Sequence, residues 1–134
     1  NDQGFSALKI LKFGLPVSFI VMLIIIILGS KAGAAYLTLF ILSSIFLSVT
    51  QPAVGLSFPS YLAGKALTSF NLLIFSGTFI MQWLIGFLID YVKTLGYSEV
   101  LGFKVAFTTF LFLSLVSYIF FIILNKNRNY NLKL

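Results

Sequence analysis

The chain has 134 residues, of which 60% are hydrophobic and only 9% are charged, and its mean hydropathy is +1.08. Soluble domains have about 25% charged residues, so this composition cannot provide a water-facing surface for a globule of this size. The formal net charge is +6. Because the charges flank apolar runs and form no continuous basic face, we expect no binding to nucleic acid.

Neither cysteine nor histidine occurs in the sequence. Thiolate and imidazole metal sites, disulfide bonds and histidine proton switches are therefore excluded. The remaining residues offer no nucleophile–base pair, no paired carboxylates and no phosphate-binding loop. We expect no enzymatic activity, no catalytic residue, no metal site and no cofactor.

Four long apolar runs follow one another along the chain. A helix that spans a membrane needs about 20 apolar residues, and none of the runs shows the alternation with period two of barrel strands. The sequence therefore predicts an all-α membrane protein with four transmembrane helices. In chain order, the predicted helices cover residues 13–29, 34–57, 67–92 and 103–124.

The basic residues are unequally divided between the two sides of the predicted membrane. One side has six, namely Lys9, Lys12, Lys65, Lys126, Arg128 and Lys133, and the other has three, namely Lys31, Lys93 and Lys104. Because cytoplasmic segments carry the excess of Lys and Arg, we place both ends and the 58–65 connection in the cytoplasm, with 125–134 as a basic cytoplasmic tail. The chain begins with Asn1 and enters its first apolar run almost at once, so we expect it to be a piece of a longer protein.

The second and third predicted spans each carry a polar stripe at helical spacing. An amide in hydrocarbon is costly unless it meets a partner or water, so the amides should face protein or a cavity. Each residue either bonds helix to helix or lines a path for a transported solute, and we expect at least one amide to lie on such a path. The first and fourth spans are oily and are expected to be peripheral. The two stripes contain Ser44, Ser48, Gln51 and Gly55, and Asn71, Phe75, Thr78, Gln82 and Gly86.

Four residues are candidates for helix bending or gating: Pro52, Gly55, Gly86 and Asp90. Pro52 removes the hydrogen bond to the Ser48 carbonyl. It either bends the second span beside a cavity or begins the end of that helix. Asp90 lies at the outer end of the third span, where a contact at the helix end or a gate is favoured over proton coupling.

Pro16 lies in the first span. We expect it to be tolerated as part of the first helical turn, where N–H groups have no partner within the helix.

Residues 58–90 carry a family resemblance. Phe58-Pro59, Gly64-Lys65-Ala66, Asn71, Phe75, Gly77, Gln82-Trp83, Ile85-Gly86 and Ile89-Asp90 resemble the tenth and eleventh helices of bacterial transporters of the major facilitator superfamily. The resemblance implies that the four spans are similar to helices nine to twelve of a twelve-helix bundle. Residues 1–134 would then be the C-terminal transmembrane portion of a transporter in the bacterial inner membrane.

The resemblance implies transport of a small solute by alternating access, with the missing N-terminal helices and the lipid bilayer as partners. On this interpretation Gln82→Leu should impair transport more than Ser114→Leu. One alternative is a small four-helix drug exporter that dimerises, a class that usually relies on a membrane-embedded glutamate absent here. The other is a membrane subunit that assembles with partners through the faces of Gln51, Asn71 and Gln82. Sequence upstream of Asn1 would distinguish them.

Overall fold

The computed structural model describes the backbone of residues 7–131 and the side chains of residues 8–125. Helices form all of its regular structure, and the described residues contain no strand. Two short 3₁₀ segments, η1 and η2, accompany five α-helices. In chain order, the elements are α1 (Ala7–Leu28), η1 (Gly29–Lys31), α2 (Ala34–Ser44), η2 (Ile45–Val49), α3 (Thr50–Leu56), α4 (Ser60–Thr94) and α5 (Glu99–Asn131).

Four helical segments are long and apolar enough to cross a membrane. These segments are Leu8–Lys31, Ala34–Leu56, Ser60–Thr94 and Glu99–Asn125. The second of them combines α2, η2 and α3. The prediction of an all-α chain with four helices of membrane-spanning length is therefore confirmed for the described part of the chain.

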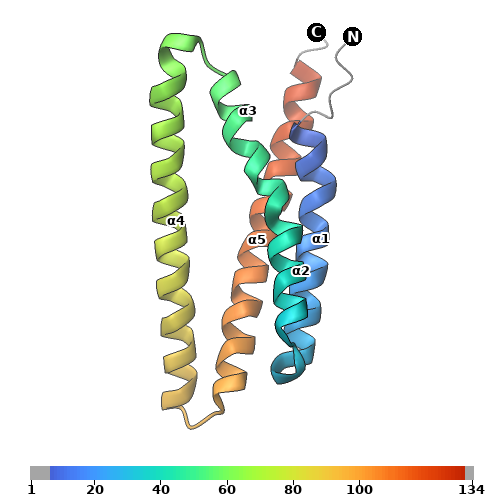
Figure 1. Ribbon diagram of the computed structural model, residues 1–134, viewed down its shortest axis with the longest axis vertical. Coiled ribbons are helices and arrows are strands. Elements are labelled where there is room, and N and C mark those ends of the chain that lie inside the picture. The colour runs from blue at the N-terminus through green and yellow to red at the C-terminus, as the bar shows by residue number, and fades with distance from the viewer. Residues whose placement is uncertain (1–6, 132–134) are drawn as a thin grey trace.

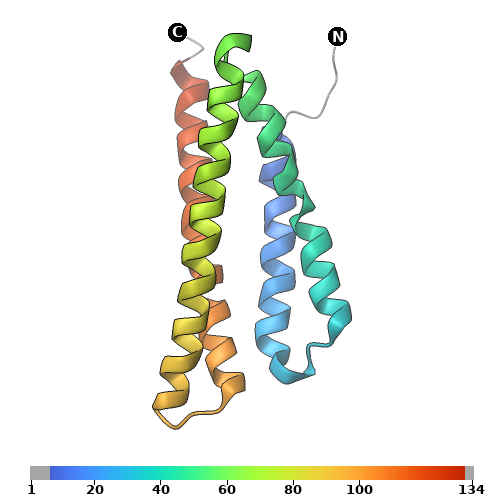
Figure 2. The ribbon, with the colours of Figure 1, turned by 60° about the vertical axis from the view of Figure 1, so that its left-hand side comes forward.

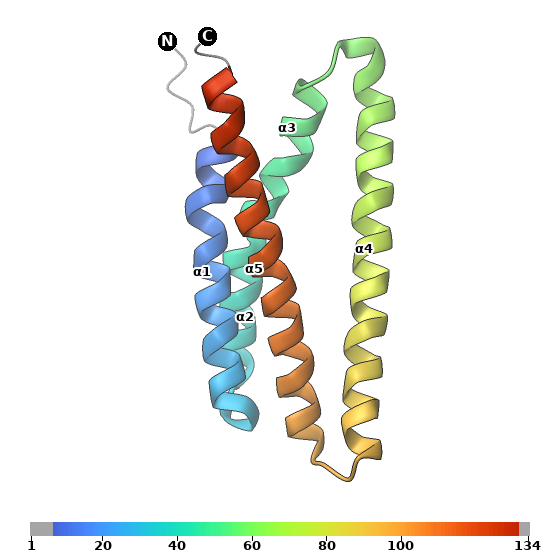
Figure 3. The same ribbon diagram turned by 180° about the vertical axis from the view of Figure 1, so that it is seen from behind.

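The four segments run up and down as two hairpins (Figure 1). Figure 2 shows α1 beside α2 in one hairpin and α4 beside α5 in the other. Seen from behind in Figure 3, α5 lies between α1 and α4, and it packs against both. The segment α3 leans away from the line of α2 and packs against α4. The helix α4 therefore forms the outer edge of the assembly.

The last two helices are longer than the sequence indicated. The helix α4 begins at Ser60, so the predicted connection at 58–65 shrinks to residues 57–59. The Pro59 carbonyl accepts the N–H groups of Leu62 and Ala63 at 2.8 and 3.0 Å, which starts the helix directly after the proline. With 35 residues, α4 is about 52 Å long. It exceeds the thickness of a bilayer of about 40–45 Å, so it must tilt or protrude.

The helix α5 continues to Asn131 and so includes most of the predicted tail at 125–134. Its side chains beyond Asn125, and residues 132–134 altogether, lie outside the described part.

A tight four-residue connection at 95–98 joins α4 to α5. Gly96 has a φ of +84°, in the left-handed region that favours glycine at the end of a helix. The Tyr97 N–H donates to the Val92 carbonyl at 3.3 Å, and the Gly96 N–H donates to the Lys93 carbonyl at 3.0 Å. Both bonds occupy carbonyls that would otherwise lack partners at the helix end. The turn therefore fixes α4 and α5 as antiparallel neighbours.

The buried core is concentrated on α1. Leu11, Ser18, Met22 and Ile25 are all buried, and their spacing of seven, four and three residues places them on one face of the helix. Each membrane-length segment contains an apolar stretch of 18 residues. In the first segment 28% of this stretch is buried, and in the third segment none of it is. Among these four segments, the first thus has the largest buried share, although most of its apolar stretch is not buried. Its apolar face contacts protein because α2 and α5 cover it.

Close contacts at two glycines hold neighbouring helices together. A Cβ atom on Gly102 of α5 would lie 3.2 Å from the Cα and carbonyl oxygen of Ile89 in α4. A Cβ atom on Gly14 of α1 would lie 2.5 Å from the ring of Phe46 in η2. Small residues of this kind allow close approach of helices in a membrane, where dispersion contacts replace the hydrophobic effect.

Candidate functional site

The second membrane-length segment is interrupted near its middle. The α-helix stops at Ser44, passes through five 3₁₀ residues in η2 and resumes at Thr50 as α3. Pro52 is the third residue of α3. Because proline has no N–H and its ring clashes with the carbonyl four residues earlier, regular α-helix is disfavoured just before it. The segment bends at this point (Figure 1).

The break divides the polar stripe predicted for this segment. A 3₁₀ helix has about three residues per turn instead of 3.6, so the spacing no longer keeps the residues before and after η2 on one face. Ser44 faces a cavity near α1 and α5. Its hydroxyl donates to the Phe40 carbonyl at 2.8 Å, and the Ser48 hydroxyl donates to the Ile45 carbonyl at 2.7 Å. Gln51 is turned toward α4.

Two of the predicted amides meet each other. The Gln51 Nε2 donates to the Asn71 Oδ1 at 3.1 Å, which links α3 to α4. Gly55, on the next turn of α3, lies against the side chain of Leu67, with 3.3 Å from a notional Cβ to the nearest leucine carbon. The close approach of the two helices at Gly55 brings the amides within bonding distance. This pair therefore joins helices, one of the two roles predicted for it.

The rest of the predicted stripe on α4 meets no other helix. All residues from Leu72 to Ile80 are exposed, including Phe75 at 72%. The Thr78 hydroxyl donates to the Ile74 carbonyl of its own helix at 2.9 Å. Gln82 is exposed and forms no hydrogen bond within the described residues. The middle of α4 thus has no buried residue between Leu72 and Ile80, although the helix contacts α3 and α5.

The remaining two candidates also lie on α4. The helix passes through Gly86 without a break, and a Cβ there would meet nothing within 4 Å. Asp90 is exposed and lies one turn before the end of the helix at Thr94. Neither residue bends α4, so a bend in the third span does not occur in this structure.

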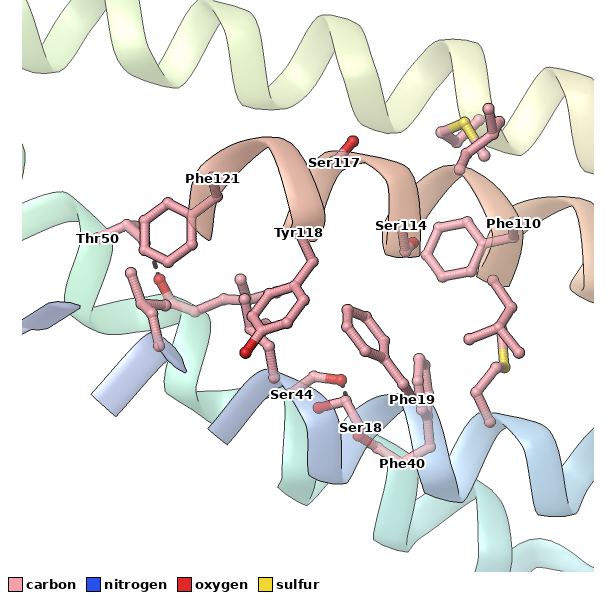
Figure 4. Close-up of a pocket in the computed structure, with 17 residues that line it drawn as sticks. Ser18, Phe19, Phe40, Ser44, Thr50, Phe110, Ser114, Ser117, Tyr118 and Phe121 are labelled. Atoms are coloured by element: carbon pink, nitrogen blue, oxygen red, sulfur yellow. Dashed lines mark hydrogen bonds between the residues drawn. The ribbon is translucent and has the colours of Figure 1, made fainter. Parts of the chain in front are cut away.

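A cavity of about 500 Å³ lies between α1, the α2–α3 segment and α5. Most of its lining consists of leucine, phenylalanine and methionine side chains (Figure 4), and α4 contributes Met81 to it. Of the predicted site residues, Ser44 alone belongs to this lining. The polar residues of the lining are Ser18, Ser44, Thr50, Ser114, Ser117 and Tyr118.

Three of these polar residues come from α5, which the sequence analysis treated as an oily peripheral helix. Ser114, Ser117 and Tyr118 are spaced by three and one residues, so all three lie within one turn of α5. Their spacing is visible in the sequence, but one interpretation of such hydroxyls is that they bond back to carbonyls of their own helix. That interpretation holds for Thr109, whose hydroxyl donates to the Val105 carbonyl at 2.9 Å. It fails for Tyr118, whose hydroxyl reaches another helix.

The Tyr118 hydroxyl donates to the Lys12 carbonyl of α1 at 2.7 Å. In a regular helix the N–H of residue 16 would donate to this carbonyl, but residue 16 is Pro16. Because α1 begins at Ala7, Pro16 lies in the helix interior, and the prediction that it belongs to the first turn is wrong. The tyrosine of α5 supplies the missing donor, which is how neighbouring helices allow proline inside membrane helices.

Two further polar contacts hold the helices around the cavity. The Ser18 hydroxyl of α1 donates to the Ser43 carbonyl of α2 at 2.7 Å in a buried position. At the far end of α1, the Lys104 Nζ of α5 lies 3.4 Å from the Ile27 carbonyl. A cation there also opposes the negative end of the helix dipole. Hydrogen bonds thus link α1 to both neighbours, at Ser18 beside the cavity and at Ile27 near the far end of the helix.

The described ends of the chain, Ala7 and Asn131, lie at the same end of the bundle, as an even number of crossings requires (Figure 1). Lys9, Lys12 and Lys65 are near this end, and Lys31, Lys93 and Lys104 are near the other. The predicted excess of positive charge therefore depends on Lys126, Arg128 and Lys133. The side chains of these three residues lie outside the described part.

Comparisons with protein-family models, curated proteins and solved structures returned no match for this chain. The described side chains bring together no group of three or more acidic, cysteine or histidine residues that could hold a metal ion. The fold therefore defines the class of protein: an α-helical chain with four helices long and apolar enough to cross a membrane.

Proposed function

We propose that this chain is part of a secondary active transporter that moves a small solute across a membrane by alternating access. It would correspond to helices nine to twelve of a twelve-helix bundle of the major facilitator superfamily type, in a bacterial inner membrane, with both chain ends in the cytoplasm. The observation that carries the proposal is the exposed Gln82 amide on the unpacked middle of α4.

An amide surrounded by hydrocarbon loses its hydrogen bonds to water, at a cost of several kcal/mol, about 4–8 by transfer to cyclohexane. Gln82 has no partner within the described residues that would offset this cost. Further helices of the same transporter, with a water-filled path between them and α4, would provide one. The bare segment from Leu72 to Ile80 fits the same interpretation.

The interruption at η2 supports the proposal independently. A stretch of 3₁₀ helix in the middle of an α-helical segment often marks a hinge, and broken helices frequently border transport sites. Here the break lies between the cavity-facing Ser44 and the amide pair of Gln51 and Asn71. A helix that can bend at η2 could move α3 and the α4–α5 hairpin relative to α1 and α2.

Cysteine labelling tests the proposal without knowledge of the solute, because residues 1–134 contain no cysteine and any cysteine elsewhere in the full-length protein can be replaced first. Gln82→Cys and Phe112→Cys would be compared in the full-length protein in membrane vesicles, with a membrane-impermeant maleimide. Phe112 on α5 is 63% exposed and serves as the comparison because its side chain is apolar. Maleimide reacts with the thiolate, which forms only where water reaches the sulfur, so we expect Gln82→Cys to react about tenfold faster or more.

Equal protection of both cysteines would mean that water does not reach Gln82, because it faces either lipid or a packed partner, and would contradict the proposal. Uptake provides the second measurement: once a screen of labelled sugars and amino acids has identified a solute, Gln82→Leu should reduce its uptake more than Ser114→Leu. Equal loss in the two variants would show that the stripe on α4 is not the solute path.

The exposed face of α4 also supports a second candidate function, an assembly subunit that binds other membrane proteins through Gln82 and its neighbours. Under this alternative, the maleimide would fail to reach Gln82→Cys in the assembled complex. Gln82→Leu would then release the partners in detergent, and uptake would be unaffected. Eight further apolar runs upstream of Asn1 would favour the transporter.

A further inference from the structure

We propose that the cavity between α1, the α2–α3 segment and α5 is a binding site for a neutral, mainly apolar small molecule with one hydrogen-bond acceptor, such as a carbonyl or ether oxygen. Ser114 is the donor in this site. The inference is independent of the transport proposal, because it rests on the side of α5 that faces α1 and α2 and not on the exposed stripe of α4.

The size and lining of the cavity define the class of ligand. Its volume of about 500 Å³ falls within the range of about 300–1,000 Å³ that is usual for small-molecule sites. Leucine, phenylalanine and methionine side chains form most of the wall, and no charged residue contributes to it. An ionised ligand would therefore be buried without a counter-charge, at a cost that excludes it. An apolar cavity of this kind binds apolar molecules in preference to water.

The hydroxyl groups identify where the acceptor of the ligand would lie. Four of the six polar residues in the lining already donate elsewhere, to the carbonyls of Ser43, Phe40, Leu47 and Lys12. The hydroxyls of Ser114 and Ser117 donate to no group in the described part of the chain. Ser117 lies on the side of α5 toward α4, whereas Ser114 lies on the side toward α1 and the cavity (Figure 4). Ser114 is thus the free donor of the site.

The depth of Ser114 favours a free small molecule over the acyl chain of a lipid. Ser114 lies in the middle third of the segment Glu99–Asn125, near the centre of a hydrocarbon layer of about 30 Å. At this depth an acyl chain presents only methylene and methyl groups, and its ester oxygens remain near the surface. A carbonyl carried within a compact apolar molecule can reach the Ser114 hydroxyl.

Photolabelling with benzophenone tests the inference. Benzophenone is neutral, has two aromatic rings and one carbonyl, and crosslinks to nearby C–H bonds under near-ultraviolet light. The full chain in phosphatidylcholine vesicles would be illuminated at increasing concentrations of the probe, and the labelled residues would be identified by mass spectrometry. We expect saturable labelling at Met22 and Met81, which face the cavity from α1 and α4.

Three variants separate the site from general partition into the membrane. Ser114→Ala keeps the space but removes the donor, so half-saturation should require about threefold to tenfold more probe. Thr109→Ala removes a hydroxyl of the same helix that already donates to Val105 and lies outside the cavity, so its labelling should be unchanged. Ser114→Phe fills the cavity and should abolish labelling, while circular dichroism confirms that the helices remain.

Three outcomes would overturn the inference. The first is labelling that never saturates and spreads over the exposed helix faces. The second is an unchanged half-saturation in Ser114→Ala. The third comes from a parallel sample in which the photoreactive group is attached to the end of a phosphatidylcholine acyl chain. Labelling of Met22 by that lipid, not displaced by free benzophenone, would assign the cavity to lipid.

Discussion

At the scale of single residues, the polar side chains of this chain compensate for defects in the helix backbone. Pro16 leaves the Lys12 carbonyl without its helical donor, and the Tyr118 hydroxyl of α5 takes that place at 2.7 Å. The ring of Tyr118 also packs edge-to-face on Phe19, with 5.6 Å between ring centroids. Tyr118 of α5 therefore both supplies the hydrogen-bond donor that α1 lacks and lines the cavity.

The first prediction concerns the hydrogen bond from Tyr118 to the Lys12 carbonyl. In Tyr118→Phe the Lys12 carbonyl loses its donor, and we expect the free energy of unfolding to fall by about 1–3 kcal/mol, the cost of an unsatisfied polar group. In the Pro16→Ala background the N–H of residue 16 can donate to the same carbonyl, so Tyr118→Phe should cost clearly less. Unfolding in mixed micelles, followed by circular dichroism, would measure both differences. An equal cost in the two backgrounds would show that the tyrosine does not replace the missing bond.

At the scale of elements, the α2–α3 segment is expected to bend more easily than the α4–α5 hairpin. The first is divided by η2 and is held by back-bonded hydroxyls such as that of Ser48. The second is fixed by the turn at Gly96 and by the close approach of Gly102 to the backbone of Ile89. Motion between the two sides of the assembly should therefore occur at η2 and not within the hairpin.

The second prediction concerns η2. Pro52→Ala restores an N–H for the Ser48 carbonyl and removes the clash of the proline ring, a change of about 3 kcal/mol in a helix interior. We expect α-helix to extend through η2, and amide hydrogen exchange over residues 45–52 to slow by about tenfold or more. Hydrogen exchange with mass spectrometry would detect the change. Pro16→Ala is the control and should leave exchange in this segment unaltered; the same exchange rate in Pro52→Ala would mean that other residues impose the break.

The third prediction compares Gly102, which packs closely against another helix, with Gly86, which has no neighbour within 4 Å. Gly102→Leu places a side chain against the Ile89 backbone, which cannot move aside as a flexible side chain would, and should destabilise the chain by about 1–3 kcal/mol. Gly86→Leu points into open space and gains helix propensity, so it should be neutral or stabilising. The same unfolding measurement applies to both. A loss in Gly86→Leu as large as in Gly102→Leu would contradict the helix packing described above.

At the scale of the whole molecule, the described helices form an incomplete enclosure. The helix α1 is covered by α2 and α5. By contrast, α4 is exposed along its middle, and its apolar stretch of 18 residues contains no buried residue. Trp83, Phe87 and Tyr91 stack along one face of α4 with ring centroids 5.5 and 6.1 Å apart. All three are more than half exposed. Such a face is suited to contact with lipid or with further helices.

The fourth prediction concerns orientation in the membrane. Tyr97 in the 95–98 connection and Phe58 in the 57–59 connection are 59% and 48% exposed and lie at opposite ends of α4. With both chain ends in the cytoplasm, Tyr97→Cys should react with an impermeant maleimide on intact cells, and Phe58→Cys should react only after the cells are permeabilised. The reverse pattern would invert the proposed topology and show that the basic residues of 125–134 do not determine it.

Composition and the length of the apolar runs were sufficient to predict four helices of membrane-spanning length, because only long helices satisfy every backbone polar group in hydrocarbon. Helix ends were predicted less well. The sequence placed the start of the third helix at residue 67, whereas hydrogen bonds to the Pro59 carbonyl start it at Ser60. Helical turns with polar or charged residues, such as that at Lys65, continue a helix beyond its apolar part.

Periodicity in the sequence determined which residues share a face of α4, since an uninterrupted helix keeps its spacing. It also marked Gln51 and Asn71 as amides that need a partner. Only the tertiary structure decided that they bond to each other, that η2 separates Ser44 from them, and that the cavity is lined by hydroxyls of α5. The physical reason is that these features depend on how the helices cross and where a helix breaks. Both are set by contacts between residues as distant in the sequence as Lys12 and Tyr118.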